Sequence, residues 1–499
     1  MDEILLPAEM NEADRLAAAA GPFDSYRLML NAGAAVTDAI LARFANAEGF
    51  DVLCGPGNNG GDGYVVARLL GERGLNVRLW RTVKRRPDTD AARAAGECPI
   101  HANALEDFTP EPGWLVVDAL FGAGLSRPLE GVHATALQKV AASEARVVSV
   151  DLPSGVSGES GLVLGTAPAA DLTVTFFRRK PGHLLYPGRN RCGETLVADI
   201  GIAETVLQTI RPRCRENVPA LWQAALPYPT EDAHKYERGH VGVFSGGPSR
   251  TGAARLAARG AARIGAGAVT LLSPGTALAV NAMHLTSIML RRVEDAAEFA
   301  AFRHERSAGA YVLGPGFGVD ERARVFTEEV LAPDTAAHLV LDADGITAFA
   351  DVPERLFAAA AESRGTLVLT PHMGEFARLF PDLAADDTSS KLAKARQAAA
   401  RSSAIIVLKG ADTVIATPDG EAAINTNATP YLATAGSGDV LSGMIAGLMA
   451  GGMPGFSAAC AAVFLHCEAG KAVGPGLIAE DLPEALPPVL RSYLQNSVQ

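Results

Sequence analysis

The first half of the chain places two aspartates where apolar segments end. Asp118 follows such a segment in VVDALFGAGLSRPLEG, and Asp151 follows another in SVDLPSGVSGESG. Each aspartate is followed by a glycine-rich loop. Asn59, Asp118 and Ser154 offer hard oxygen ligands of low total charge, which suit a monovalent or divalent cation, whereas Asp151 could transfer protons instead. For either aspartate alone, stabilising a turn is the simpler interpretation.

A third loop in this half, GPGNNGGDG at residues 55–63, holds five glycines within nine residues. Glycines let a backbone approach a ligand closely, and a helix beginning near Asp62 would present free N–H groups to an anion. The loop is therefore a candidate phosphate-binding loop. The alternative is a strand-to-helix turn in which Asn58, Asn59 and Asp62 cap the helix. Neither the dinucleotide-binding pattern nor the P-loop pattern is present in proper form.

The second half contains ATAGSGDVLSG, in which four small residues precede Asp439 at an expected helix start. Backbone N–H groups at Ala435 to Gly438 could surround an anion there, with Asp439 beside it. Phosphoryl transfer needs both parts, donors for the transferred group and a base for the attacking hydroxyl. The alternative is that Asp439 is only a helix N-cap.

Three further groups of polar residues accompany this segment. Lys409 and Thr413 lie in an expected hairpin at residues 405–420, where they could contact a nucleotide phosphate, although a lone lysine is more often solvated. His372 follows a strand and either binds a ligand or bonds to backbone. Arginines at residues 255, 259 and 263 share one helix face, which indicates a solvated face by default and a phosphate patch or subunit contact as the alternative.

Apolar runs rich in Val and Leu alternate with helical patterns along both halves. They lie at residues 50–55, 75–80, 114–120, 145–151 and 172–177, and then in GHVGVFSG, AGAVTLLSP, AYVLGPG, AHLVLDADG, GTLVLTPH and AIIVLKGA. Such runs are typical of strands covered on both faces, and so of parallel sheets with crossover helices. We expect two α/β domains, residues 1–215 and 222–499, with the junction in 204–234. Ligands of such sheets bind beyond the carboxyl ends of the strands.

The composition fits a globular protein of 499 residues, with 44 Lys and Arg against 56 Asp and Glu and a net charge of −12. This balance argues against nucleic acid or a membrane surface as a partner. The six cysteines form no C-x-x-C pair and the acidic N-terminus does not resemble a signal peptide, so we expect a cytoplasmic location. The uncharged stretch 440–465, interrupted by GGMPG, predicts two buried helices rather than a membrane span.

NNGGDG, VDALFGAGL and VDLPSG, in this order, resemble the N-terminal domain of the NAD(P)H-hydrate epimerase family over about residues 1–202. The resemblance implies a Rossmann-like fold and interconversion of the R and S forms of hydrated NADH and NADPH. It implies K⁺ ligands at Asn59, Asp118 and Ser154, and an acid/base at Asp151, which would contact the hydrated ring. The residues implied to bind the substrate also include Asn58, Asn59, Gly60, Gly61, Asp62, Gly122, Ala123, Gly124, Leu125, Ser126, Arg127 and Pro128.

HKYERGHVGVFSGG, GPGFG, LDADG, PHMGEF, LKGADT and ATAGSGDVLSG resemble, in that order, the ribokinase-like domain of NAD(P)H-hydrate dehydratases. Such enzymes use ADP or ATP to phosphorylate the hydroxyl of the S hydrate, and loss of phosphate restores NADH or NADPH. The resemblance implies that Asp439 activates the hydroxyl and that Mg²⁺ takes part, although no Mg²⁺ ligand stands out. The residues implied to contact the hydrate are Ala262, Gly316, His372 and Asp439, and those implied to hold the nucleotide are Lys409, Gly410, Ala411, Asp412, Thr413 and Gly438.

Together the two resemblances predict a bifunctional enzyme that repairs hydrated NADH and NADPH, with small-molecule substrates and a homo-oligomeric state. One alternative is a small-molecule kinase, which would form a stable phosphorylated product and leave the first half unexplained. Another is a nucleotide sensor without turnover. The presence of Asp118, Asp151 and Asp439 together argues against the sensor.

Overall fold

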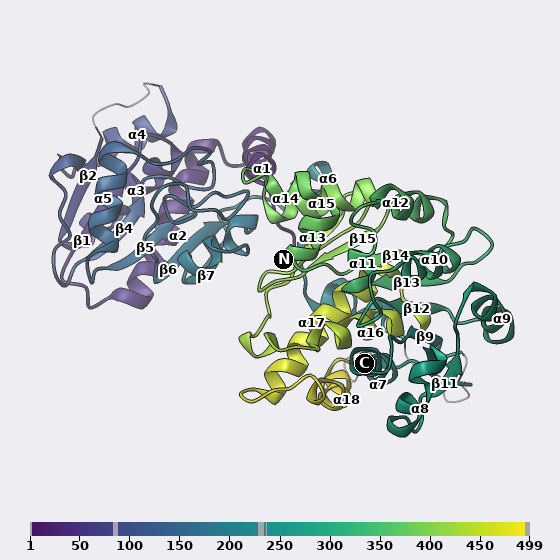
Figure 1. Cartoon of the computed structure of the whole chain (residues 1–499). Helices are drawn as coiled ribbons and strands as arrows, with labels where there is room; N and C mark the ends of the chain where they lie inside the picture. Colours follow the sequence, from purple (N-terminus) through teal and green to yellow (C-terminus); the bar gives the residue numbers. More distant parts are fainter. Residues whose placement is uncertain (1, 83–87, 228–233, 236, 495–499) are drawn as a thin grey trace. The chain divides into compact units, whose positions relative to one another are not determined.

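In each part of the chain, strands lie in the middle and helices lie outside them (Figure 1). The structure is a computed structural model that describes residues 2–82, 88–227, 234–235 and 237–494. The chain divides into two units, Met1–Arg215 and Glu216–Gln499. The predicted fold class, two α/β domains with mainly parallel sheets, is confirmed. Residues 228–233 of the predicted junction and Tyr236 of the HKYERG motif lie outside the described residues.

Seven strands form the sheet of the first unit: β1 (Phe50–Cys54), β2 (Val77–Arg81), β3 (Ala102–Ala104), β4 (Leu115–Ala119), β5 (Arg146–Val150), β6 (Leu172–Phe176) and β7 (Glu194–Ala198). Their order is β3-β2-β1-β4-β5-β6-β7, and every neighbouring pair is parallel. All residues of β1, β4 and β6 are buried. Burial on both faces explains why these strands are continuously apolar apart from a few polar positions.

The strand order of this sheet reverses between β1 and β4, which is where such sheets bind ligands. The helices are α1 (Pro7–Ala20), α2 (Ser25–Phe44), α3 (Asn58–Glu72), α4 (Asp90–Glu97), α5 (Gly131–Ala141) and α6 (Val206–Ile210). The prediction that a helix begins near Asp62 is wrong, because α3 begins at Asn58. Its N-cap is Gly57 and no side chain caps it, so the alternative in which Asn58, Asn59 and Asp62 serve as caps is wrong as well.

Ten strands form the second sheet: β8 (Cys214–Glu216), β9 (His240–Phe244), β10 (Ala268–Ser273), β11 (Met289–Arg292), β12 (Ala310–Leu313), β13 (His338–Leu341), β14 (Leu367–Leu369), β15 (Ile405–Leu408), β16 (Val414–Ala416) and β17 (Ala422–Ile424). The order is β11-β10-β9-β12-β13-β14-β15-β16-β17-β8. The predicted hairpin of β15 and β16 is confirmed by their antiparallel pairing. The order reverses between β9 and β12, so the loops after these strands mark the second expected site.

The helices of the second unit are α7 (Thr251–Ile264), α8 (Gly275–His284), α9 (Ala296–Arg306), α10 (Glu321–Val330), α11 (Asp344–Thr347), α12 (Pro353–Glu362), α13 (Met373–Leu379), α14 (Pro381–Ala385), α15 (Lys391–Ser402), α16 (Ser437–Ala450), α17 (Gly455–Val473) and α18 (Asp481–Leu494). The side chains of Asp295, Asp320 and Ser390 accept from backbone N–H groups and cap α9, α10 and α15. Short 3₁₀ turns lie at Leu105–Asp107, Pro181–His183, Gly188–Arg191, Pro219–Leu221, Gln223–Ala225 and Pro430–Leu432.

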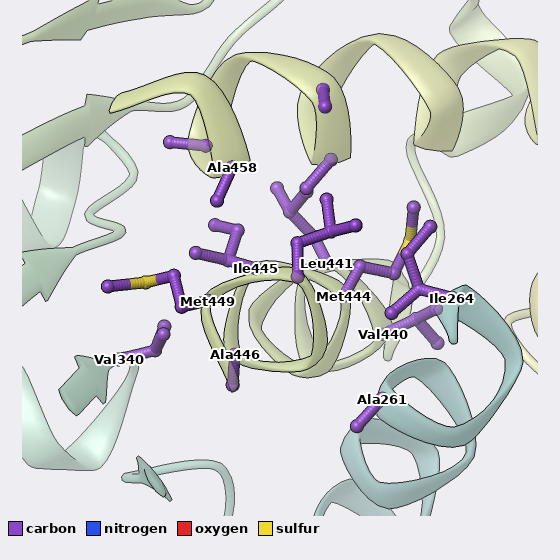
Figure 2. Packing of buried hydrophobic residues seen from close by; sticks show 14 of the residues in the cluster. Ala261, Ile264, Val340, Val440, Leu441, Met444, Ile445, Ala446, Met449 and Ala458 are labelled. Atoms are coloured by element: carbon purple, nitrogen blue, oxygen red, sulfur yellow. The ribbon is translucent and has the colours of Figure 1, made fainter. Parts of the chain in front are cut away.

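Helix α16 runs through the core of the second unit. Figure 2 shows it surrounded by Val340 of β13, Ala458 of α17, and Ala261 and Ile264 of α7. A Cβ added at Gly443 would lie 1.9 Å from the carbonyl oxygen of Ala257, so glycine lets the two helices approach closely. This contact fixes the position of the loop that precedes α16.

The uncharged stretch at 440–465 forms two buried helices joined by a turn, as predicted. Within the described residues, α17 is the one helix long and apolar enough to cross a membrane by length and composition. More than half of its most apolar window is buried inside the protein, as is expected of a core helix.

Candidate active sites

A cavity of about 490 Å³ lies beyond the carboxyl ends of β1 and β4 in the first unit. Among the predicted binding residues, Asn58, Asn59 and Asp62 line it from α3, and residues 122–127 line it from the loop after β4. Gly60 lies behind this wall, because a Cβ there would be 2.0 Å from the carbonyl oxygen of Gly55. Three predicted residues, Gly60, Gly61 and Pro128, are absent from the cavity lining in this described region.

Asp151 follows β5 and faces the cavity with a backbone φ of 63°, a left-handed conformation that aspartate tolerates better than most residues. Its Oδ1 accepts hydrogen bonds from the Lys180 Nζ at 2.8 Å and the Thr175 Oγ1 at 2.9 Å, and its Oδ2 accepts from the Ala123 N–H at 2.8 Å. A Cβ at Gly122 would lie 2.7 Å from that Oδ2. The glycine therefore makes room for the carboxylate beside the loop.

Lys180 sets the charge state of Asp151. Burial favours the neutral acid, but Lys180, His183 and the hydrogen bonds from Lys180 and Ala123 together outweigh it and lower the pKa of Asp151 to about 2. Burial and Lys180 together lower the pKa of His183, whose Nε2 bonds to the Asp151 carbonyl, to about 4. The sequence reasoning missed Lys180, since RRKPGH carries no pattern that links it to Asp151.

Asp14 and Asp62 are two more carboxyl groups in the lining of the cavity. Burial, opposed by Lys180 and reinforced by Asp151, raises the pKa of Asp14 to about 6. Burial with repulsion from Asp151 and Asp14 raises the pKa of Asp62 well above its usual range. The cavity thus contains one carboxylate held ionised, Asp151, and two carboxyl groups whose pKa values are raised, Asp14 and Asp62.

The predicted cation ligands meet around residues 121–122. Both oxygens of buried Asp118 accept from Ser154, one from its Oγ at 2.6 Å and one from its N–H at 2.8 Å. The Phe121 N–H donates to the Ser154 Oγ at 2.8 Å, and a Cβ at Gly122 would lie 3.0 Å from the Asn59 Oδ1. Asn59, Asp118 and Ser154 are therefore brought together.

The chemistry of this cluster fits a potassium ion. Asp118 has no ion-pair partner among the described residues, and burial raises its pKa against the opposing hydrogen bonds from Ser154. The described residues contain no cluster of three or more His, Cys, Asp or Glu suited to a metal. An oxygen-only set of one carboxylate, one amide and one hydroxyl matches a hard cation of low charge.

The second candidate site surrounds the start of α16. Gly436 is its N-cap at φ 90°, and no side chain caps the first turn. The predicted alternative in which Asp439 caps the helix is therefore wrong, because Asp439 is the third residue of the helix. N–H groups at such a helix start attract anions. One of the four N–H groups predicted to surround the anion, that of Ser437, donates to the Thr434 carbonyl at 3.4 Å.

Asp439 lies within a network of charges. Burial raises its pKa to about 7, with repulsion from Asp342 and other carboxylates exceeding the attraction of Lys409. The Lys409 Nζ lies 2.9 Å from the Asp342 Oδ1 and 3.9 Å from the Glu375 Oε2. A Cβ at Gly438 would lie 3.4 Å from that Nζ. The structure thus places Lys409 at the start of α16, together with two acids, Asp342 and Glu375, that the sequence reasoning did not select.

The loop at residues 410–413 is closed on itself. The Thr413 Oγ1 donates to the Gly410 carbonyl at 2.8 Å and accepts from the Gly410 N–H at 3.1 Å. Buried Asp412 pairs with Lys391 at 2.7 Å, and Ala411 is exposed. The predicted nucleotide loop is therefore rigid, and Lys391 is a support that the sequence reasoning missed.

The residues predicted to contact the hydrate are brought together only in part. His372 is exposed, and its Nδ1 accepts from the N–H groups of Gly374 and Glu375 at the start of α13, so it does bond to backbone. Its Nε2 lies 3.3 Å from Glu375, the residue near Lys409. Gly316 lies at the reversal of strand order, with its carbonyl oxygen 1.9 Å from a Cβ added at Gly246.

Ala262 does not join this group. It packs against the hydrophobic core, and its neighbour Ala261 lies against Gly447, which is about 12 Å along α16 from Asp439. The alanine of α7 beside Gly316 is Ala253, whose Cβ lies 3.5 Å from a Cβ added at Gly316. The repeated small residues of α7 hid this difference, because sequence alone does not tell its alanines apart.

The three arginines of α7 have overlapping surroundings. Arg259 and Arg263 both pair with Glu484 of α18, and both remain partly exposed. Arg255 and Arg259 line a smaller cavity with His284 of α8 and other residues. Two of the three charges therefore hold α18 against α7.

Comparisons with known proteins cover both units. A family profile described as NAD(P)H-hydrate dehydratase matches residues 241–487, and one described as YjeF-related protein N-terminus matches residues 25–182. Two similar curated relatives are both called bifunctional NAD(P)H-hydrate repair enzyme. That of Thermofilum pendens is 34% identical, covering 98% of this chain and 96% of the relative. That of Moorella thermoacetica is 36% identical, covering 99% and 98%.

Solved structures are similar to the second unit. One is the ADP/ATP-dependent NAD(P)H-hydrate dehydratase from Bacillus subtilis, co-crystallised with ATP and Mg²⁺. It is 28% identical, with a TM-score of 0.48, and the match covers 54% of this chain and 95% of that chain.

Proposed function

This chain belongs to the family of bifunctional NAD(P)H-hydrate repair enzymes, and on that premise we propose a division of labour between its two units. Residues 1–215 epimerise the R and S hydrates of NADH and NADPH. Residues 222–499 dehydrate the S hydrate at the expense of ADP or ATP. The observation that carries the second activity is the uncapped start of α16 with Asp439 in its first turn and Lys409 beside Gly438.

In the first unit, the hydrated ring occupies the cavity beyond β1 and β4, with Asp151 beside the hydroxyl. The hydroxylated carbon also bears the ring nitrogen, so the nitrogen lone pair can expel the hydroxyl and water can add again. Asp151, held ionised by Lys180, takes up a proton from the added water and stabilises the cationic ring. Asn58, Asn59 and Asp62 at the start of α3, with residues 122–127 of the loop after β4, bind the rest of the substrate.

A potassium ion is the proposed occupant of the cluster of Asn59, Asp118 and Ser154. The ion would neutralise buried Asp118 and hold residues 121–122 in place. Because Ala123 donates a hydrogen bond to Asp151, order in this loop keeps the carboxylate aimed into the cavity. The chain's own residues perform the proton transfer, and the cation supplies charge and rigidity.

In the second unit, Asp439 accepts the proton of the S hydrate's hydroxyl while the oxygen attacks the terminal phosphate of ADP or ATP, the bond from that phosphorus to the bridging oxygen breaks, and AMP or ADP leaves. The N–H groups at the start of α16 and the Nζ of Lys409 face the charge that develops on the phosphoryl group. The ring nitrogen then expels phosphate, loss of a ring proton completes the elimination, and NADH or NADPH results.

We propose the remaining roles in this site by position. Residues 409–413 and Gly438 hold the adenine nucleotide, and Gly316 and His372 contact the hydrate, with Ala253 in place of Ala262. Mg²⁺ accompanies the nucleotide. The donor set fits an ion that takes most of its ligands from phosphates and water, and Asp342 and Asp439 are the carboxylates that would hold it. We also propose that the enzyme is a cytoplasmic homo-oligomer.

The test uses the purified S hydrate with the full chain, Mg²⁺ and either ADP or ATP. We expect NADH and inorganic phosphate to form in equal amounts. Accumulation of a stable phosphorylated hydrate without phosphate release would identify a small-molecule kinase instead. Binding of nucleotide without any product would identify a sensor.

A further inference from the structure

Asp14 brings a carboxyl group into the epimerase cavity from a helix that no motif includes. It lies on α1, and it lines the same cavity as Asp151 and Lys180. Its side chain forms no hydrogen bond and no ion pair within 4.0 Å among the described residues, in contrast to Glu12 on the same helix, which pairs with Arg15. Because the half-buried carboxyl group of Asp14 forms neither contact with the described residues, it is available to a ligand.

The charges around Asp14 come from every wall of the cavity. The charges of Lys180 after β6 and Asp151 after β5 shift the pKa of Asp14. Asp14 in turn raises the pKa of Asp62 of α3. Asp90 and Arg127 are the other ionisable groups of the lining. As a result the pKa of Asp14 is about 6 and that of Asp151 about 2. Two carboxyl groups whose pKa values are driven apart are the usual mark of an acid and a base.

Epimerisation requires proton transfer on both faces of the ring. The R and S hydrates carry the hydroxyl on opposite faces of the same carbon. A hydroxyl that leaves from one face must receive a proton there, and water that adds on the other face must lose one there. One carboxylate at a fixed position can serve only one face unless the ring turns over inside the cavity. A second carboxyl group removes that need.

We propose that Asp14 is a catalytic residue of the epimerase site, the acid that serves one face of the hydrated ring while Asp151 serves the other. The carbon–oxygen bond breaks with its electrons on oxygen, Asp14 gives its proton to that oxygen, and water leaves. The nitrogen lone pair forms a carbon–nitrogen double bond. Water then adds to the opposite face and its proton passes to Asp151. Proton exchange with solvent resets both groups, and the reverse reaction follows the same path.

This inference rests on the proposed epimerase function, and exchange of ¹⁸O from labelled water tests both separately. The full-length wild type interconverts the hydrates and incorporates label into both. In Asp14→Asn, interconversion falls about 100-fold or more, the usual size of a general acid's contribution. One epimer nevertheless keeps exchanging its hydroxyl, because leaving and return on the Asp151 face remain possible. In Asp151→Asn, the other epimer keeps exchanging.

The pH dependence gives a second readout. Asp14 acts as the protonated acid, so the wild-type epimerisation rate decreases as pH rises above about 6, and this decrease is absent in Asp14→Asn. Glu12→Gln, on the exposed side of α1, is the matched control and keeps the wild-type rate and profile. Circular dichroism and thermal unfolding of the same preparations check that the first unit is folded in each variant.

Two results would overturn the role of Asp14. One is a wild-type rate of interconversion in Asp14→Asn. The other is a pair of results: Asp14→Asn loses ¹⁸O exchange from both epimers, and Asp62→Asn interconverts the hydrates slowly while one epimer keeps exchanging. That pair would identify Asp62 as the acid in place of Asp14. A wild type that neither interconverts nor labels the hydrates overturns the epimerase function itself and the role of Asp14 with it.

Discussion

Asp439 and the charges around it set the pH at which the second unit works. Its pKa of about 7 comes from burial and from nearby carboxylates, led by Asp342. A general base acts in its ionised form, so a raised pKa means that activity is lost as pH falls through that value. We therefore expect kcat for dehydration of the S hydrate to fall about tenfold for each pH unit below about 7.

Two substitutions should move this pH profile in opposite directions. Asp342→Asn removes a negative charge that raises the pKa of Asp439, so the pH profile shifts to lower pH. Lys409→Met removes a positive charge that lowers the pKa of Asp439, so the pH profile shifts to higher pH. The measurement is kcat against pH at saturating ADP or ATP. A wild-type profile that is flat across neutrality, or shifts of the same sign in both variants, would contradict the role of Asp439 as the base.

The potassium cluster makes a prediction about stability in the first unit. A ligand that binds only the folded state stabilises it by about 2.7 kcal/mol when present at 100 times its Kd. We expect KCl to raise the unfolding temperature of the wild type relative to choline chloride at equal ionic strength. Asp118→Asn should abolish this difference, because it removes the only carboxylate of the set. An equal response of both proteins to KCl would argue against the site.

Single residues were predictable from sequence where a short motif held them. Asp118 and Asp151 lie at strand ends before glycine-rich loops, and Asp439 follows the small residues AGSG at a helix start; the structure brings each of them to a site. Lys180 and Asp14 escaped notice, because only the tertiary fold brings them to Asp151 from distant segments. Their type and local sequence give no sign of that position.

At the scale of elements, the packing of α7 on α16 rests on glycines that have no room for a side chain. A Cβ at Gly443 would clash with the Ala257 carbonyl at 1.9 Å, so Gly443→Ala should lower the free energy of unfolding of the second unit by about 1–3 kcal/mol. Gly252→Ala, also in a helix but with nothing within 4 Å of the added Cβ, should instead be stabilising by about 0.4–1 kcal/mol.

Urea unfolding of both variants, followed by circular dichroism, measures these changes. Because α16 also carries Asp439, we expect Gly443→Ala to reduce dehydratase activity while epimerisation is unchanged. Equal stability of the two variants would show that α7 and α16 do not approach as closely as described.

The central strands were predictable, since runs buried on both faces leave a continuous apolar signal. The strands β3, β7 and β11 were not predicted, because none of their residues is buried and they therefore carry no continuous apolar run. The start of α3 was misplaced because its first turns are rich in glycine. Close packing explains those glycines, as a Cβ at Gly61 would lie 2.6 Å from the Met29 side chain.

At the scale of the whole molecule, two activities on one chain make repair complete. The dehydratase accepts only the S hydrate, and the epimerase converts the R hydrate into it. The predicted consequence is that a mixture of hydrates is recovered in full by the wild type. A chain that lacks one activity should stop at a point that identifies which activity is missing.

The most direct measurement follows the return of nicotinamide absorbance after the full chain is mixed with R and S NADPH hydrates, Mg²⁺ and ADP or ATP. We expect the wild type to recover the whole mixture and Asp439→Asn to recover none. Asp151→Asn should recover the S portion at the wild-type rate and the R portion slowly, so early time points separate it from spontaneous epimerisation. Full recovery at the wild-type rate by both variants would contradict the account.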